Sequence, residues 1–455
     1  MKRAWAIAAL TLRAAIRSRV LAALTVLLIL ASVGLPLTVR GDGTAAGHAQ
    51  ILLSYTLGAA ALVLSISSVW SGCAAISQEI RDRQMHLLAV KPVRPLEIWV
   101  GKWLGLVAMN ALLLAFSGAI VYGLLRWTTR PEALAADERT ALDEEILVAR
   151  AMARPDESEF EAATREAFRR ELTEGRMADD ARPDEAYRAF RHLRRLQFYG
   201  VPPGALREWR IRLPAAPAPD RPIFLRFRFA KSELAPTAVA GQWFIGAGDE
   251  VRLTVAGEWP PDAFHSIPMP ARPLLGEREI VVAFGNGDPS GAAVFFDPDR
   301  GLEILMRAGG FAGNFARAGL LLLVQLAFLS AVGLAAGAVF SMPVASFVSI
   351  SLVLLMRISG YIGEMAGQRQ YFAEAGRAGP GAALADHALR LVFRALKTAL
   401  APLELPDALD LLASGRLISW GAVAGAAAVH LALYGGLLAA GSAWVLRRRE
   451  LGLPS

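Results

Sequence analysis

The sequence predicts an α-helical protein that crosses a membrane several times and carries a large inserted α+β domain. Three observations predict this class. The 455 residues are 54% hydrophobic with a positive mean hydropathy, which is too apolar for a soluble chain, although 20% are charged. Several uncharged apolar runs have about the 20 residues that a helix needs to cross roughly 30 Å of hydrocarbon. Residues 127–313, by contrast, are polar and mildly acidic.

The first segment, residues 1–19, is a basic leader that precedes the first apolar run. Its cations Arg3, Arg13 and Arg17 suit an amphipathic helix that lies on phosphate headgroups at the cytoplasmic membrane surface. A secretory signal with a small-residue cleavage site near Ala31-Ser32-Val33 is the alternative interpretation. We favour the interfacial helix because the basic head is long and the apolar run continues beyond signal length.

Six apolar runs predict six transmembrane helices. The fourth and fifth together have roughly the length of two spans. They are interrupted at Ser341-Met342-Pro343, where proline breaks a helix, so we expect a tight hairpin. The expected domains hold three spans in residues 20–126, two in residues 314–360 and one in residues 418–455. The six runs are Val20–Val39, Ile51–Ile76, Trp103–Leu125, Phe315–Phe340, Val344–Ser359 and Ile418–Leu446.

Basic residues predict the orientation. Lys and Arg in short loops stay preferentially in the cytoplasm. The leader, the connector at residues 77–102 and the tail Arg447–Arg449 are all basic, and an even number of spans places them on one side. Both chain ends are therefore expected in the cytoplasm. Residues 361–417 are then expected outside, with a basic amphipathic stretch at residues 382–400 lying on membrane lipid.

The insert is predicted to have two extracytoplasmic parts. Residues 127–200 are rich in Ala, Glu, Arg and Leu with opposite charges at helical spacing, which predicts a helical stalk. Residues 201–313 alternate apolar and polar positions between turn signals, which predicts a β-sandwich. Trp243 and Trp259 could stack on a sugar, but buried core aromatics are the favoured interpretation. The expected strands are Glu208–Leu213, Ile223–Phe229, Glu250–Ala256, Glu279–Phe284 and Ala292–Phe296.

The connector between the second and third runs is the most informative stretch. Residues Gln78 to Val90 can form a helix with an apolar face, which would lie across the membrane surface. Pro92 then stiffens the turn, and Pro95 with Glu97 suits the first turn of the next helix. A rigid lever joined to a membrane helix is one interpretation, and an ordinary charged loop with two prolines is the other.

The connector resembles the cytoplasmic loop after the second span in permeases of the ABC type 2 exporter family. The resemblance extends to the interfacial leader, the six spans and the basic tail, and it covers everything except the insert, where usual members have short loops. The pattern reads E-x-x-x-R, then P-V-x-R, then E-x-x-x-G-K. The residues that carry it are Glu79, Arg83, Leu88, Pro92, Val93, Arg94, Glu97, Gly101 and Lys102.

The resemblance implies a subunit without its own ATPase, in a bacterial cytoplasmic membrane. Its connector would dock on a separate ABC ATPase subunit, which would bind ATP and Mg, and a second permease copy or a related permease would complete the transporter. It implies coupling roles for Glu79, Arg83, Leu88, Pro92, Arg94, Glu97 and Lys102.

Other motifs point to no chemistry in this chain. The G-x-x-x-x-G-K-[ST] phosphate cradle is absent, because Leu96 stands at the first glycine position and Trp103 follows Lys102. The six histidines are scattered without ligand spacing, so no metal site is predicted. The polar groups inside the predicted spans are expected to hydrogen-bond neighbouring helices. These groups are Asn110, Gln325 and His430.

Two glycine pairs have the four-residue spacing that lets helices approach closely, Gly333 with Gly337 and Gly421 with Gly425. The single cysteine, Cys73, cannot form an internal disulfide.

The sequence therefore predicts a non-enzymatic permease subunit of an ATP-driven exporter, with no cofactor of its own. The alternative is a mechanotransmission or envelope scaffolding complex, in which motion is transmitted to an extracytoplasmic partner and nothing crosses the membrane. A membrane enzyme with its active site in the insert lacks a catalytic constellation. Nucleic acid is not an expected partner, because the positive charge lies in the membrane flanks.

Overall fold

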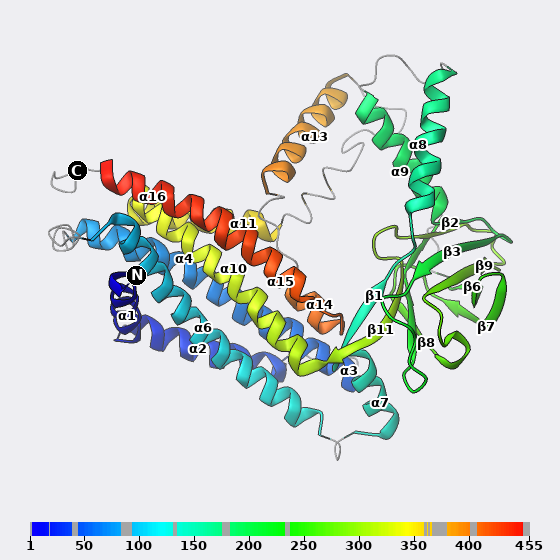
Figure 1. Ribbon diagram of the computed structural model, residues 1–455, viewed down its shortest axis with the longest axis horizontal. Coiled ribbons are helices and arrows are strands. Elements are labelled where there is room, and N and C mark those ends of the chain that lie inside the picture. Colours follow the sequence, from blue (N-terminus) through cyan, green and yellow to red (C-terminus); the bar gives the residue numbers. More distant parts are fainter. Residues whose placement is uncertain are drawn as a thin grey trace. The chain divides into compact units, whose positions relative to one another are not determined.

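The computed structural model separates into two compact units, one helical and one built around β-strands (Figure 1). Met1–Leu147 and Gly310–Ser455 form the helical unit, and Val148–Gly309 form the β-rich unit. The structure describes residues 2–17, 19–38, 44–82, 93–130, 134–174, 183–232, 237–358, 362, 365, 380–400 and 407–448.

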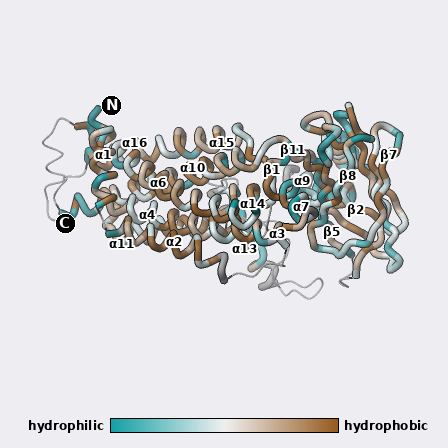
Figure 2. Tube along the Cα trace, turned by 90° about the horizontal axis from the view of Figure 1, so that it is seen from below, coloured by the Kyte–Doolittle hydropathy of each residue, from teal (hydrophilic) through white to brown (hydrophobic). Residues whose placement is uncertain are grey.

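The helices of the helical unit follow the apolar runs of the sequence. Hydrophobic residues dominate α2, α4, α6, α10 and α11 (Figure 2). Two π-helical stretches, η1 and η5, lie within long helices. The elements are α1 (Lys2–Arg17), α2 (Arg19–Thr38), α3 (Ala45–Ile51), η1 (Leu52–Thr56), α4 (Leu57–Arg81), α6 (Pro95–Thr128), α7 (Ala136–Glu145), α10 (Phe311–Val339), α11 (Met342–Arg357), α13 (Pro380–Leu400), α14 (Ala408–Ala413), α15 (Trp420–Ala426), η5 (Ala427–Gly435) and α16 (Gly436–Arg448).

Four of these helices are long and apolar enough to cross a membrane, which supports the membrane-protein class. They are Ala45–Arg81, Pro95–Thr128, Phe311–Val339 and Trp420–Arg448, and each covers all or nearly all of one predicted run. Helices α1 and α2 meet the same test only as a pair, which is bent by 66°, and the apolar helix Met342–Met356 is shorter. Six spans and their orientation stay predictions.

The interruption predicted near Ser341 is confirmed. Helix α10 ends at Val339, Phe340 and Ser341 are extended, and Pro343 lies in the first turn of α11. Helix α11 packs with α4 and α10 through a shared apolar cluster that includes Val69, Cys73, Leu329, Ala345 and Val353. Leu329 of α10 and Val353 of α11 lie at similar distances before and after the break and belong to the same cluster. Helices α10 and α11 therefore run antiparallel as a hairpin.

Helices α4 and α10 cross in backbone contact, as the first glycine pair predicts. A methyl group on Gly333 would lie 2.5 Å from the carbonyl oxygen of Val69, and one on Gly337 would lie 2.5 Å from that of Cys73. Gly72 faces the same crossing from α4, where a methyl group would lie 2.8 Å from the Ser330 oxygen. Only glycine fits such an approach, so these residues fix the distance between the helices.

The second glycine pair does not pack in this way. The nearest atom to a methyl group on Gly421 would be the Ser419 hydroxyl at 3.7 Å, and Gly425 has open space around it within the described part of the chain. Four-residue spacing shows that two glycines share a helix face, but it does not show whether that face meets another helix.

The β-rich unit contains three antiparallel sheets, with strand orders β1-β11-β4-β8, β2-β10-β5 and β3-β9-β6-β7. Residues from all three sheets contribute to one hydrophobic core. Four of the five predicted strands are present, and the fifth, Ile223–Phe229, is divided between β4 and β5, which belong to different sheets. The strands are β1 (Val148–Ala153), β2 (Gly200–Val201), β3 (Leu206–Arg212), β4 (Ile223–Phe227), β5 (Phe229–Lys231), β6 (Val239–Ala247), β7 (Glu250–Trp259), β8 (His265–Met269), β9 (Glu279–Asn286), β10 (Val294–Phe296) and β11 (Leu302–Gly310).

Aromatic rings fill the centre of this core. Trp243 is fully buried and packs against Phe227 and Phe284, with ring centroids 4.8 Å apart in both pairs. Trp259 is half-buried and meets the Phe227 ring edge to face at 5.2 Å. The core interpretation of Trp243 is therefore confirmed, and its ring has no free face for a sugar.

The predicted helical stalk at residues 127–200 is partly wrong. Residues 148–153 form strand β1 beside β11 instead of helix, because pairing within a sheet outweighs the high helix propensity of Ala, Arg and Met. Further on, α8 (Ser158–Thr173) and α9 (Pro183–Phe198) are helical as predicted. They pack as an antiparallel pair through the rings of Phe160 with Phe198 and Phe168 with Phe190.

An ion pair between α8 and α9 predicts a pH-dependent contribution to stability. The Arg191 guanidinium donates hydrogen bonds to Glu161, including one of 2.6 Å from Nε, and this lowers the pKa of Glu161 below its usual value. A lowered carboxyl pKa stabilises the fold above the ordinary value near 4.3 and loses that contribution as the pH falls through the lower folded value.

Arg191→Gln should therefore lower the stability of the β-rich unit by about 1 kcal/mol or less at pH 7, since both groups are partly solvated. The difference in thermal midpoint between variant and wild type, followed by circular dichroism, should begin to shrink below pH about 4 and vanish once the pH is below the lowered pKa of Glu161. Arg169→Gln removes the same charge from an exposed position on α8 and serves as the control. A difference that persists at low pH would show that Arg191 acts through packing instead of charge.

Candidate coupling site at the ends of helices α4 and α6

The end of α4 and the start of α6 form the base of the connector. Helix α4 continues without a break through Gln78 to Arg81. A separate surface helix was predicted to begin at Gln78. Its described residues, Gln78–Arg81, are instead the last turn of α4, because nothing in Ile76-Ser77-Gln78 interrupts that helix. Residues 83–92 lie outside the described residues, and with them the predicted site residues Arg83, Leu88 and Pro92.

The start of α6 has the cap that the sequence predicts. Arg94 is the extended N-cap residue, Pro95 follows at the first helical position, and the Glu97 carboxylate accepts a hydrogen bond of 3.0 Å from the Arg94 backbone N–H. Proline fixes the backbone of the first turn, and the acidic side chain complements the positive end of the helix dipole. The connector therefore enters α6 at a rigid joint.

Glu79 and Lys102 form an ion pair that ties the two helices together. The Lys102 ammonium also donates to the Ala75 carbonyl oxygen at 2.9 Å. Its side chain is 5% exposed, against 28% for Glu79. The second carboxylate oxygen of Glu79, Oε2, is buried without a hydrogen-bond partner among the described residues, so it can accept a further donor. Glu79 and Lys102, which were each predicted to couple to a partner subunit, therefore contact each other in the structure.

Helix α1 packs against the same end of α6 at a close crossing. A methyl group on Gly101 would lie 2.8 Å from the Ala4 oxygen, and one on Gly105 would lie 2.8 Å from the Ala8 oxygen. The sequence analysis missed this contact, although Gly101 and Gly105 have the same four-residue spacing as the pairs that it considered. The amphipathic leader is thus part of the site.

Helix α6 is also joined to α10 by two side-chain hydrogen bonds. The Trp103 indole donates to the Ala327 oxygen at 2.8 Å, and the Asn110 amide donates to the Ser330 hydroxyl at 3.1 Å. Asn110 thus bonds a neighbouring helix, as predicted. His430 instead contacts the Ala426 oxygen of its own helix at 3.0 Å, and Gln325 is half-buried.

This arrangement has the character of a mechanical joint. Among the described residues, no group of three or more His, Cys, Asp and Glu side chains could hold a metal ion. The site instead links α1, α4, α6 and α10 at one end of the helical unit, so that movement of the connector would be transmitted to all four. Comparisons with protein-family models, with curated proteins and with solved structures give no match to this chain.

Proposed function

We propose that this chain is the permease subunit of an ATP-driven ABC transporter of type 2, acting as an exporter in a bacterial cytoplasmic membrane. The Glu79–Lys102 pair carries the proposal, because it fastens both ends of the connector to each other. A separate ABC ATPase would bind the connector and α1, and two permease copies would form the transporter.

The length of α6 supports a lever mechanism. The helix runs unbroken over 34 residues, which is about 50 Å. Because its first turn is capped at Arg94 and its next turns are held by Lys102 and α1, displacement of the connector moves the helix as a unit. The hydrogen bonds of Trp103 and Asn110 would pass that movement to α10.

Cysteine labelling tests which side the connector faces and what binds it. Cys73 is the single cysteine, so a Cys73→Ser chain with Arg81→Cys carries one exposed thiol at the end of α4. A membrane-impermeant maleimide should label it in inside-out vesicles and not in intact spheroplasts. The partner is sought among neighbouring reading frames that encode a Walker motif, and its purified product should protect the thiol. Labelling from the outer side alone would refute the proposal.

A second function is mechanotransmission to an envelope partner. It is favoured by the β-rich unit, which has its own core and is joined to α10 without linker residues, since β11 ends at Gly310 and α10 begins at Phe311. Removal of the β-rich unit, Val148–Gly309, distinguishes the two functions. An exporter would still move cargo, whereas a mechanotransmission complex would keep ATP hydrolysis and lose its partner.

A further inference from the structure

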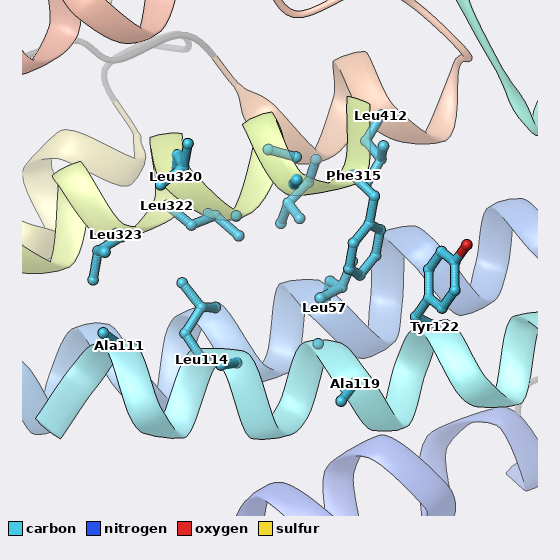
Figure 3. A pocket seen from close by; sticks show the side chains of 16 residues that line it. Leu57, Ala111, Leu114, Ala119, Tyr122, Phe315, Leu320, Leu322, Leu323 and Leu412 are labelled. Atoms are coloured by element: carbon cyan, nitrogen blue, oxygen red, sulfur yellow. The ribbon is translucent and has the colours of Figure 1, made fainter. Parts of the chain in front are cut away.

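Helices α4, α6, α10 and α14 enclose an apolar groove of about 420 Å³ (Figure 3). It exists because small side chains line the α6 face that is turned towards α10. Ala111, Ala115 and Ala119 recur at four-residue spacing, and Gly118 lies beside them. Such residues leave the space that larger side chains would fill between two packed helices. Phe315 closes the groove from α10 (Figure 3).

The groove opens sideways from the helical unit, since Ala115 and Ala119 are exposed. Its lining side chains are hydrocarbon except for the hydroxyl of Tyr122 at one end. Both α4 and α6 are long and apolar enough to span a membrane, so this opening would face the acyl chains of a bilayer.

The polar end of the groove carries a cation. Arg126, one turn beyond Tyr122, donates hydrogen bonds of 3.2 and 3.3 Å to the Tyr122 hydroxyl and is exposed. No carboxylate forms an ion pair with it among the described residues. Trp127 follows and is 60% exposed, and tryptophan, tyrosine and arginine gather where a span meets the headgroups. An anionic headgroup therefore finds its counter-charge at this end.

The lining of the groove and the charge at its end favour a lipid chain as its occupant. Ala111 and Tyr122 are eleven residues apart, or about 16 Å along α6. The lining is hydrocarbon over this length, and the one polar end lies beside Arg126. A molecule that is apolar along its length and anionic at one end matches both features, whereas an apolar helix would leave Arg126 without a counter-charge.

We propose that this groove binds one acyl chain of an anionic phospholipid from the surrounding bilayer, with the headgroup phosphate at Arg126. The acyl chain fills the space left by the small side chains of α6, and the exposed Arg126 guanidinium pairs with the phosphate. The site is independent of the proposed function, because it depends on neither the connector nor an ATPase.

Photolabelling of the purified full chain in nanodiscs tests the site. The probe is phosphatidylglycerol with a diazirine in its acyl chain, and the expected label falls in peptides covering residues 111–122 and 315–323. Gly118→Leu should reduce this label several-fold, because a Cβ there fits at 3.6 Å from the Phe315 ring and the rest of the side chain enters the groove. Gly123→Leu adds the same bulk where no atom lies within 4 Å and should leave the label unchanged.

The headgroup is tested separately. Arg126→Gln should lower labelling by phosphatidylglycerol and leave that by a matching phosphatidylcholine probe unchanged. If Gly118→Leu does not yield folded protein, Ala115→Leu fills the same groove from an exposed position. The proposal is overturned if Gly118→Leu and Ala115→Leu label as strongly as Gly123→Leu, if both probes respond equally to Arg126→Gln, or if the groove residues crosslink to a second copy of the chain.

Discussion

Glu79→Gln is expected to lower the free energy of unfolding of the helical unit by about 3 kcal/mol, because it leaves the buried Lys102 ammonium without its counter-charge. The Ala75 carbonyl oxygen remains as a hydrogen-bond acceptor but cannot neutralise the cation. The loss should lower the thermal midpoint by roughly 6 °C or more. Cys73 is buried one and a half turns earlier in α4, so its reaction with a fluorogenic maleimide during heating reports the unfolding.

The partner variant separates lost charge from lost packing. Lys102→Met keeps most of the side-chain volume and leaves Glu79 without its cation, at a side chain that is 28% exposed against 5% for Lys102. We expect a smaller cost of about 1 kcal/mol. The double variant should resemble Lys102→Met alone, since no unpaired cation remains, which corresponds to a coupling energy of about 3 kcal/mol. Strictly additive effects would show that the two residues act independently.

The long helices could be predicted from the sequence because one property, the length of uncharged apolar runs, determines where a chain can cross a bilayer. Their ends do not follow from that property, and the start of α6 could be predicted only from its capping residues Pro95 and Glu97. Helix α6 begins at Pro95 and ends at Thr128, well beyond the apolar run Trp103–Leu125. The flanking turns are held by the Arg94 cap and the α1 contact, and neither affects hydropathy.

The strands missed in the β-rich unit share a different cause. Strand β6 contains Gly241 and Gly246, which weaken a strand signal, yet it is the central partner of both β7 and β9. Strand β1 reads as helix from its composition and is determined by its place beside β11. Strand β1 depends on pairing with a segment far away in the sequence, and β6 pairs with the distant β9 as well as with its hairpin neighbour β7. Local patterns do not encode the distant pairings.

The candidate site was predictable residue by residue but not as an arrangement. Pro95 and Glu97 act within one helical turn, so their capping role follows from spacing alone. The pairing of Glu79 with Lys102 spans 23 residues and depends on how α4 and α6 cross. Atom Oε2 of Glu79 accepts no hydrogen bond from the described residues. It is therefore the atom at which binding of a further donor can be tested.

Gly337→Ala is the change expected to disturb the helical unit most directly. The added methyl group would lie 2.5 Å from the Cys73 carbonyl oxygen and 3.2 Å from the carbonyl carbon, and backbone atoms of a packed helix cannot move aside as a flexible side chain can. We expect a loss of about 1–3 kcal/mol, as for other overpacked interiors. This loss exceeds the gain of nearly 1 kcal/mol that alanine brings to a helix over glycine.

Gly425→Ala is the matched control, because it makes the same chemical change in another membrane-length helix where the methyl group meets no atom within 4 Å. At Gly425 the only expected effect is the higher helix propensity of alanine, so the free energy of unfolding should stay the same or rise. Maleimide reaction of Cys73 reports the crossing itself, and tryptophan fluorescence reports the whole chain. If Gly337→Ala leaves Cys73 as protected as Gly425→Ala does, α4 and α10 do not meet through their backbones. The lever would then lack the fixed support that lets movement of α4 reach α10.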